Sequence, residues 1–311
     1  MKRATISAMR AGSSLVLAGL AACGGGGGAP DAAIDAGPRC DPAAPFGPPA
    51  VVGGLNSDQD DAAARLSPDE LEVTFARLTG GVWDLWRATR ASVDEPFGAP
   101  ALLTTVNSIR SDVWPTVSPD GLVLLFDADR TTPNTFHIWR STRASTSVPF
   151  GPPQPRPELM DDDVQPMLAN EAALYFVSTV RGGLGAGEIL RAPIDAAGAI
   201  GTPVAIVGDV NTADHEDSPA ITADERFIYF RRQPASGMAM ESDVFTASRS
   251  TPSDGFGASA PVPGLDRAGV GEIPNWVSPD NCHLYVHSDA DTGGGPMGTN
   301  IWMAARAAAA P

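Results

Sequence analysis

Short hydrophobic runs recur along the chain between turn residues, in a pattern that repeats about every fifty residues. Three Ser-Pro-Asp tripeptides and two degenerate copies of them mark the repeat. These five turns begin at Ser67, Ser118, Ala169, Thr222 and Ser278. Proline presets φ at one corner of a turn, and Gly or Asn tolerates the next corner. Each marker therefore predicts a tight turn between two strands.

The runs around each marker predict four strands per unit. One strand precedes the turn, and a second, apolar almost throughout, follows it, as in Leu-Val-Leu-Leu-Phe at 122–126. A third carries a tryptophan in three units, at Trp86, Trp139 and Trp302, and a fourth follows a Phe-Gly pair, as at 100–103. A continuously apolar strand suits a sheet that is covered on both faces. Four-stranded units of this period, packed against their neighbours, form the blades of a β-propeller.

The two ends of the chain complement each other. The last unit stops after its third strand, near Arg306, while the missing Phe-Gly strand lies at 46–52. Pairing of these segments would close a ring and remove the open sheet edges. The sequence thus predicts an all-β fold, a five-bladed β-propeller of four-stranded antiparallel blades whose last blade is closed by the N-terminal strand. An open array of β-units is the alternative.

The N-terminus has the pattern of a secretory signal. Three positive residues precede an apolar stretch at 14–22, and a glycine-rich tract follows Cys23. Residues 20–23, Leu-Ala-Ala-Cys, resemble the bacterial lipobox. The resemblance implies cleavage before Cys23 and lipidation of Cys23; an ordinary signal peptide with an incidental cysteine is the alternative. We expect a signal peptide at 1–22, a flexible tether at 23–44 and the propeller at 45–311.

Composition narrows the class of protein. Hydrophobic residues make up 43% of the chain, and the net charge is −16, which argues against nucleic acid because phosphate binding needs a basic face. No apolar run is long enough for a membrane-spanning helix. We expect a monomer anchored through its lipid in the bacterial cell envelope, at the outer membrane, facing the periplasm or the cell surface.

The repeats resemble a known family. Residues 112–121, Asp-Val-Trp-Pro-Thr-Val-Ser-Pro-Asp-Gly, together with Phe126 and Ile138-Trp139, look like the WD40-like repeats of TolB-type propellers. The resemblance covers about residues 45–306, and two repeats, at 168–171 and 222–225, depart from the motif. It implies a scaffold for protein or ligand contacts in the envelope. TolB has six blades and a further domain, so its own role does not carry over.

One acidic residue lies six positions before each turn. The acids are Asp61, Asp112, Asp163, Glu216 and Glu272. In a propeller they would form a ring at the mouth of the central channel, where carboxylates can bind Ca²⁺ or a polyhydroxy ligand. Four units also carry an arginine after the second strand, at Arg77, Arg130, Arg181 and Arg232. Pairing of acid and guanidinium is the structural alternative, and repetition in every blade favours it.

The fifth unit breaks this arginine pattern. It carries Asp289 and Asp291 before a glycine run, and the second unit has a similar pair at Asp127 and Asp129. These residues are weak candidates for a metal site, since the loop lacks the closing glutamate of a calcium-binding loop. The alternative is that they are solvated loop tips. No cofactor is expected otherwise.

Two cysteines remain after Cys23, and a secreted protein occupies an oxidising compartment. Cys40 precedes the N-terminal strand, and Cys282 lies in the first turn of the last unit. Both loops open on the same face of the same blade. We expect a disulfide between Cys40 and Cys282; two free thiols are the alternative.

No catalytic motif emerges. The chain lacks a Gly-x-Ser-x-Gly elbow and a His-Glu-x-x-His motif, and it has four histidines. We expect a binding or assembly module without catalysis, which contacts an envelope protein or a small ligand or glycan at the channel mouth. The alternative is a glycosidase that uses channel carboxylates, as some five-bladed propellers do. A catalytic pair of carboxyl groups needs different environments that separate their two pKa values. A ring of near-equivalent acids does not provide this, which counts against the glycosidase alternative.

Overall fold

A computed structural model describes residues 39–181, 183–235, 243–265, 270–290 and 298–309. These residues form strands and turns without a helix, so no described helix could cross a membrane. The predicted signal peptide, Cys23, most of the predicted tether, and Asp291 lie outside the described residues, and the predictions made for them stay predictions.

Five four-stranded antiparallel sheets make up the fold. Blade 1 consists of β2 (Asp61–Leu66), β3 (Glu72–Thr79), β4 (Val82–Thr89) and β5 (Ala101–Leu102). Blade 2 consists of β6 (Asp112–Val117), β7 (Val123–Thr132), β8 (Thr135–Thr142) and β9 (Gln154–Pro155). Blade 3 consists of β10 (Asp163–Asn170), β11 (Ala173–Ser178), β12 (Glu188–Pro193) and β13 (Val204–Ala205).

The last two blades follow the same order of strands. Blade 4 consists of β14 (His215–Ile221), β15 (Phe227–Gln233), β16 (Asp243–Ser248) and β17 (Ala260–Pro261). Blade 5 consists of β18 (Glu272–Val277), β19 (His283–Ser288), β20 (Asn300–Ala305) and β1 (Ala50–Val51). Because β1 comes from the other end of the chain, blade 5 joins the two ends of the described chain.

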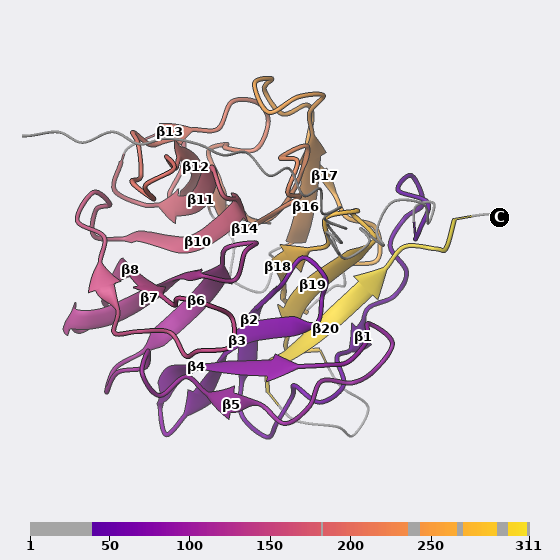
Figure 1. The fold of residues 1–311 in the computed structure, drawn as a ribbon. Helices are drawn as coiled ribbons and strands as arrows, with labels where there is room; N and C mark the ends of the chain where they lie inside the picture. Colours follow the sequence, from indigo (N-terminus) through magenta and orange to yellow (C-terminus); the bar gives the residue numbers. More distant parts are fainter. Residues whose placement is uncertain (1–38, 182, 236–242, 266–269, 291–297, 310–311) are drawn as a thin grey trace, which may run out of the picture. The chain divides into compact units, whose positions relative to one another are not determined.

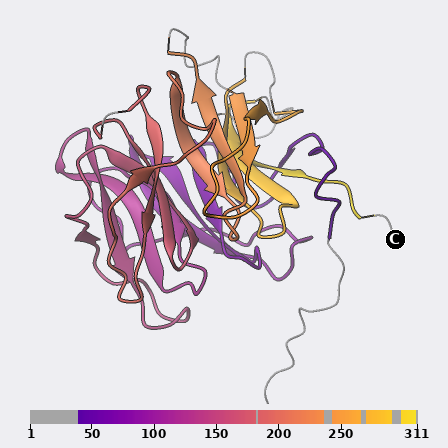
Figure 2. The ribbon, with the colours of Figure 1, turned by 90° about the horizontal axis from the view of Figure 1, so that it is seen from above.

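The sheets close into a ring. The innermost strands β2, β6, β10, β14 and β18 each contact the next, and β18 contacts β2 (Figure 1). In β1, Ala50 pairs with Met303 and Val51 with Trp302. Figure 2 shows the sheets side by side from a second direction. The predicted five-bladed propeller, closed by its N-terminal strand, is confirmed.

The core lies between neighbouring sheets. The second strand of each blade is packed on both faces, and every residue of β11 is buried. Phe126 and Leu124 of blade 2 pack with Leu85 and Ala76 of blade 1 in one such layer. This arrangement explains why the central residues of the second strands are mostly hydrophobic: a side chain on either face meets another blade.

The Ser-Pro-Asp turns are held by their own side chains. In blade 2, Ser118 Oγ donates to Asp120 Oδ1 at 2.5 Å, and the Leu122 amide donates to the same oxygen at 2.9 Å. The residue after the aspartate has a left-handed backbone, with φ of 61° at Glu70 and 74° at Gly121. The motif thus fixes both the turn and the direction of the side chain that follows it.

The N-terminal contacts with the propeller begin earlier than the predicted boundary at residue 45. Arg39 donates to Asp280 Oδ2 at 2.6 Å, and the Asp41 amide donates to the Ala307 carbonyl at 3.0 Å. Cys40 and Cys282 form a disulfide with their Cα atoms 5.6 Å apart. The chain therefore docks on blade 5 from Arg39 onward, ahead of the closing strand.

Candidate functional site: the mouth of the central channel

Four of the five predicted ring acids are the first residue of an innermost strand, and Glu216 is the second residue of β14. All five are buried. Four of them are held by the arginine of their own blade. The distances are 2.6 Å for Arg77 Nε–Asp61 Oδ1, 2.9 Å for Arg130 Nε–Asp112 Oδ1, 3.0 Å for Arg181 Nε–Asp163 Oδ1 and 2.8 Å for Arg232 Nε–Glu216 Oε1. Glu272 pairs in register with Ser288 across blade 5.

Backbone and aromatic contacts complete each acid–arginine pair. Asp61 Oδ2 accepts from the Ser57 amide at 2.7 Å and from Ser57 Oγ at 2.8 Å. The Arg77 guanidinium lies 5.1 Å from the centre of the Trp86 ring. Both carboxylate oxygens of Asp61 are therefore occupied, and the pair ties the start of β2 to β3 and β4. The geometry is that of blade packing: Arg77 Nε forms the charge-assisted bond to Asp61, and Nη2 donates to the Leu55 carbonyl at 2.5 Å.

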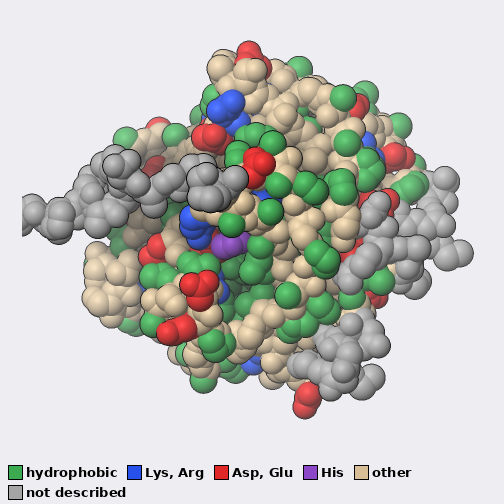
Figure 3. Space-filling model, turned by 90° about the vertical axis from the view of Figure 1, so that its right-hand side faces the viewer, with side chains coloured by type: hydrophobic (Ala, Val, Ile, Leu, Met, Phe, Trp, Pro, Cys, Tyr) green, Lys and Arg blue, Asp and Glu red, His purple; other side chains and the backbone are tan. Residues whose placement is uncertain are grey.

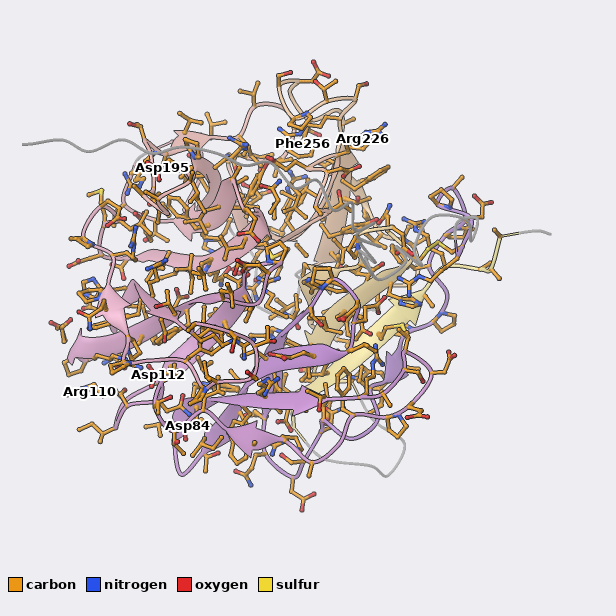
Figure 4. The ribbon with its side chains drawn as sticks, in the orientation of Figure 1. Asp84, Arg110, Asp112, Asp195, Arg226 and Phe256 are labelled. Carbon is orange, nitrogen blue, oxygen red and sulfur yellow. A yellow bond between two sulfur atoms is a disulfide. The ribbon has the colours of Figure 1, made fainter. Side chains whose placement is uncertain are left out.

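Charged side chains of neighbouring blades also interact at the end of the channel where the ring acids lie. Asp84 of β4 lies near Asp112 of β6 (Figure 4), and burial together with the Asp112 charge raises the pKa of Asp84. On the face shown in Figure 3, acidic side chains are scattered among hydrophobic and uncharged ones, and a histidine lies beside basic side chains. The net negative charge is thus not gathered into one patch on that face.

A cavity of about 410 Å³ lies next to these acids, between the first residues of the innermost strands. We call it the mouth cavity. It is lined by Ala62, Ala63, Trp83, Val113, Trp114, Phe136, Arg231, Gly271, Ile273, His287, Ser288, Asp289 and Thr299. Four of the five blades contribute to this lining, so the cavity spans the channel opening.

The innermost strands share one irregularity of backbone geometry at the mouth. Each innermost strand has a register shift near its start, and Ala63, Trp114, Gln165 and Ser218 have φ between 52° and 55° there. The freed amides bond across blades: Gln165 N donates to Asp127 Oδ2 at 2.7 Å, and Ser218 N donates to Gln165 Oε1 at 2.6 Å. Such bulges redirect side chains beside binding sites.

His287 forms part of the cavity wall as a neutral imidazole. Asn275 Nδ2 lies 2.8 Å from His287 Nδ1, and the Trp114 ring centre is 5.5 Å from the His287 ring centre. Burial, and then the positive charge of Arg231, lower the pKa of His287 to about 3. The ring is therefore uncharged at neutral pH and offers hydrogen bonds without a net charge.

Arg231 supplies the fixed positive charge of the wall. Its Nε donates to Asp217 Oδ1 at 2.8 Å, and His215 Nε2 lies 3.1 Å from Asp217 Oδ2. Burial acts to raise the pKa of Asp217, but the hydrogen bonds from His215 and Arg231 outweigh it and lower that pKa to about 2. Asp217 stays ionised and fixes the guanidinium in position.

Asp127 and Asp129 correct a prediction. The alternative to a metal site placed them at solvated loop tips, but β7 extends to Thr132, and the two residues are 1% and 8% exposed. Asp127 Oδ1 has no hydrogen-bond partner among the described residues, and burial raises the pKa of Asp127 well above its usual range. The second strand of blade 2 is longer than the repeat suggested, which carries both residues into the sheet.

Of the two predicted metal candidates in blade 5, the structure describes one. Asp289 lines the mouth cavity and accepts from the Gly271 amide at 3.1 Å, while Asp291 lies outside the described residues. Within the described part of the chain, no group of three or more His, Cys, Asp or Glu side chains is placed to hold a metal ion.

Sequence reasoning missed the residues that give the mouth its chemistry. Neither Trp114 nor Trp83 has a predicted binding role. Neither His287 nor Arg231 is among the site residues that the sequence predicts. A signal was present, because the repeat has Ala76, Asp127, Val177, Arg231 and His287 at one shared position of the second strand. A position that varies so widely within a regular repeat is not fixed by blade packing alone.

Comparison with known proteins gives the fold. No protein-family model and no curated protein matches the sequence. TolB from Acinetobacter baumannii aligns with a TM-score of 0.51 and 14% identity over 81% of this chain; the match spans 55% of that TolB, just over half its length.

Two carbohydrate-active enzymes have a similar fold. The GH62 α-L-arabinofuranosidase catalytic domain of Coprinopsis cinerea aligns with a TM-score of 0.53 and 10% identity, over 85% of this chain and 97% of that one. The α-L-arabinofuranosidase of Podospora anserina, in complex with cellotriose, gives 0.53 and 11%, over 86% and 98%. The predicted TolB-like propeller fold is confirmed, and at these identities the likeness concerns the fold alone.

Proposed function

We propose that this protein is a lipid-anchored β-propeller of the bacterial cell envelope that binds a glycan or a short segment of an envelope protein at the mouth cavity. The observation that carries the proposal is the mouth cavity itself. Its volume of about 410 Å³ lies in the range of ligand pockets, and it combines aromatic walls with a few fixed polar groups.

The chemistry of the walls favours a polar ligand with an apolar face. Trp83, Trp114 and Phe136 offer flat apolar surface, while neutral His287 and fixed Arg231 offer hydrogen bonds. A sugar ring has both kinds of surface, as has a peptide side chain with a polar end. The paired acids nearby hold the strands that position these groups.

The envelope location is supported by two features of the chain. The disulfide between Cys40 and Cys282 suits an oxidising compartment. The lipobox-like residues 20–23 support lipidation at Cys23. Labelling cells with an alkyne fatty acid tests the anchor: the wild-type protein should become labelled and sediment with membranes, and a Cys23→Ser protein should do neither. Labelling of the Cys23→Ser protein would contradict lipidation at this residue.

The binding proposal is tested with the mature protein and a Trp83→Ala variant. Captured envelope proteins are identified by mass spectrometry, and envelope glycan fragments are titrated by calorimetry. We expect the wild type to retain one ligand class that Trp83→Ala loses. Val148→Ala, at a 41% exposed residue outside the mouth cavity, is the matched control and should bind like the wild type. Equal binding by wild type and Trp83→Ala would contradict the proposal.

A second candidate function is carbohydrate hydrolysis. It is favoured by the match to nearly the full length of two α-L-arabinofuranosidases and by Asp127, whose raised pKa suits a general acid. Asp127 is 1% exposed, so a substrate would have to enter the channel to reach it. Incubation with arabinoxylan and a chromogenic arabinofuranoside tests it. Turnover that Asp127→Asn abolishes would support hydrolysis. Absence of turnover by the wild type would contradict this second candidate function.

A further inference from the structure

Three of the five blade interfaces contain the same buried polar contact. The residue after the Ser-Pro-Asp-type turn, in its left-handed conformation, accepts a hydrogen bond from a tyrosine of the preceding blade. The pairs are Tyr285 with Glu70 Oε2 at 3.0 Å, Tyr175 with Glu225 Oε2 at 2.6 Å, and Tyr229 with Asn281 Oδ1 at 2.7 Å. Each pair fills the space between two blades and gives the buried tyrosine hydroxyl an acceptor.

An arginine completes each of these contacts. It follows the third strand and donates through Nε to the carbonyl of the turn residue and through Nη2 to the tyrosine hydroxyl. The arginines are Arg90, Arg249 and Arg306, with Nη2–hydroxyl distances of 3.0, 2.7 and 3.0 Å. Every buried charge at these interfaces is therefore partnered.

The interface between blades 1 and 2 lacks both halves of the pair. Thr74 stands at the tyrosine position, opposite Arg65 in the strand register, and Gly121 stands at the position of the glutamate. Arg143 keeps its Nε bond to the Gly121 carbonyl at 2.6 Å, but its Nη2 reaches Glu72 Oε1 at 3.3 Å instead of a tyrosine. At the next interface Leu125 occupies the tyrosine position and needs no partner.

A cavity of about 490 Å³ occupies the place of the missing side chains. We call it the interblade cavity. Its lining includes Arg65, Thr74, Gly121 and Arg143. Arg65 is 2% exposed, and none of its three guanidinium nitrogens has a hydrogen-bond partner among the described residues; the buried Thr74 hydroxyl also lacks one. Among the described residues, Arg87 and Arg156 also have a buried Nε without a partner, but each binds a glutamate through Nη2, which Arg65 does not.

The charge on Arg65 has no close counter-ion. Burial lowers the pKa of Arg65 to about 9, and Asp127, the acid whose charge acts on it, forms no hydrogen bond with it in the described structure. The guanidinium is still charged at neutral pH. An uncompensated buried charge is costly, and a bound anion would remove that cost.

The acids that line the interblade cavity are already engaged. Asp69 and Asp120 each hold their own turn, with Oδ1 accepting from Leu71 N at 3.0 Å and Leu122 N at 2.9 Å. Glu72 bonds the guanidinium groups of Arg87 and Arg143. These acids leave Arg65 unpaired, and their negative charge disfavours a doubly charged ligand such as phosphate.

We propose that the interblade cavity binds a small aromatic monocarboxylate, with its carboxylate on Arg65 and its ring in the space that tyrosine fills at the other interfaces. The ligand then supplies the two groups that this interface lacks: a planar ring and an anion. A guanidinium binds a carboxylate with two parallel hydrogen bonds, which gives the site its preference for this anion. The site is separate from the mouth cavity, with which it shares no lining residue.

Calorimetry with 4-hydroxyphenylacetate tests the proposal on the mature protein. We expect saturable binding that weakens about tenfold or more in Arg65→Met and for the neutral analogue 4-hydroxyphenylacetamide. Arg226→Met is the matched control, because Arg226 is exposed in the turn before β15 (Figure 4), and it should bind like the wild type. Arg65→Met removes an unpaired buried charge and should fold at least as stably as the wild type.

A second variant tests the proposal independently of Arg65→Met, in case that substitution changes the fold. Thr74→Tyr with Gly121→Glu rebuilds the pair found at other interfaces; a Cβ on Gly121 meets only the side-chain ends of Thr146 and Arg143, at 2.9 and 3.2 Å. We expect a higher Tm and no binding of the carboxylate. Four results would overturn the proposal: no saturable binding by the wild type at tens of millimolar, equal binding of the amide, unchanged binding by either variant, or tighter binding of inorganic phosphate.

Discussion

The disulfide between Cys40 and Cys282 closes almost the whole propeller into one covalent loop. It joins residues 242 positions apart, and the chain-entropy relation gives ~5.5 kcal/mol of stabilisation at 25 °C for a loop of that length. Residual structure in the unfolded chain reduces this value, so we expect about 3–5 kcal/mol. For a domain spanning Gly37–Pro311, a loss of ~4 kcal/mol lowers Tm by about 7 °C.

The perturbation is the double variant Cys40→Ser and Cys282→Ser, which leaves no free thiol in the propeller. Urea unfolding followed by tryptophan fluorescence gives the free energy of unfolding of the oxidised wild type, the reduced wild type and the variant. The reduced wild type and the variant should agree with each other and fall below the oxidised protein. A difference of less than about 1 kcal/mol from the oxidised protein would refute the loop-closure reasoning.

The remaining predictions concern buried polar groups. Arg77→Met leaves Asp61 as an unpaired buried acid and should lower the free energy of unfolding by about 3–5 kcal/mol in urea; a loss below 1 kcal/mol would contradict a structural role for the pair. The pKa of His287 is about 3 when folded and about 6.5 when unfolded, so the unfolded chain binds more protons in that window and stability falls as pH drops through it. Between pH 6.5 and 5 the wild type should therefore lose about 1–2 kcal/mol more than His287→Gln, and equal losses would show that the imidazole is not held neutral. Tyr175→Phe removes one donor to Glu225 and should cost about 1–2 kcal/mol by thermal unfolding, whereas an unchanged Tm would place this hydroxyl outside the packing of blades 3 and 4.

The sequence predicted where the candidate site lies, but not which residues line its cavity. The repeat placed five acids at one end of the channel, and the structure puts four of them on the arginines named as the alternative partners. The mouth cavity lies beside these acids. Its walls, however, come from Trp114, His287 and Arg231, which lie in three different blades and share no motif.

The sequence by itself determined the number of blades, the turn positions and the closure of the ring. These features are local or periodic: Ser-Pro-Asp fixes a turn through bonds within a few residues, and a strand covered on both faces is mostly hydrophobic at its centre. Complementary chain ends then left one way to pair β1.

Only the tertiary structure decided at which blade interface the repeat leaves a cavity. Thr74 and Gly121 are unremarkable in the sequence, and each is compatible with its own strand or turn. They leave a space because the ring brings them together at one blade interface, and Arg65 is left without a partner at that same interface. The physical reason is that a blade folds by contacts within its repeat, whereas a site between blades depends on which side chains two different repeats present to each other.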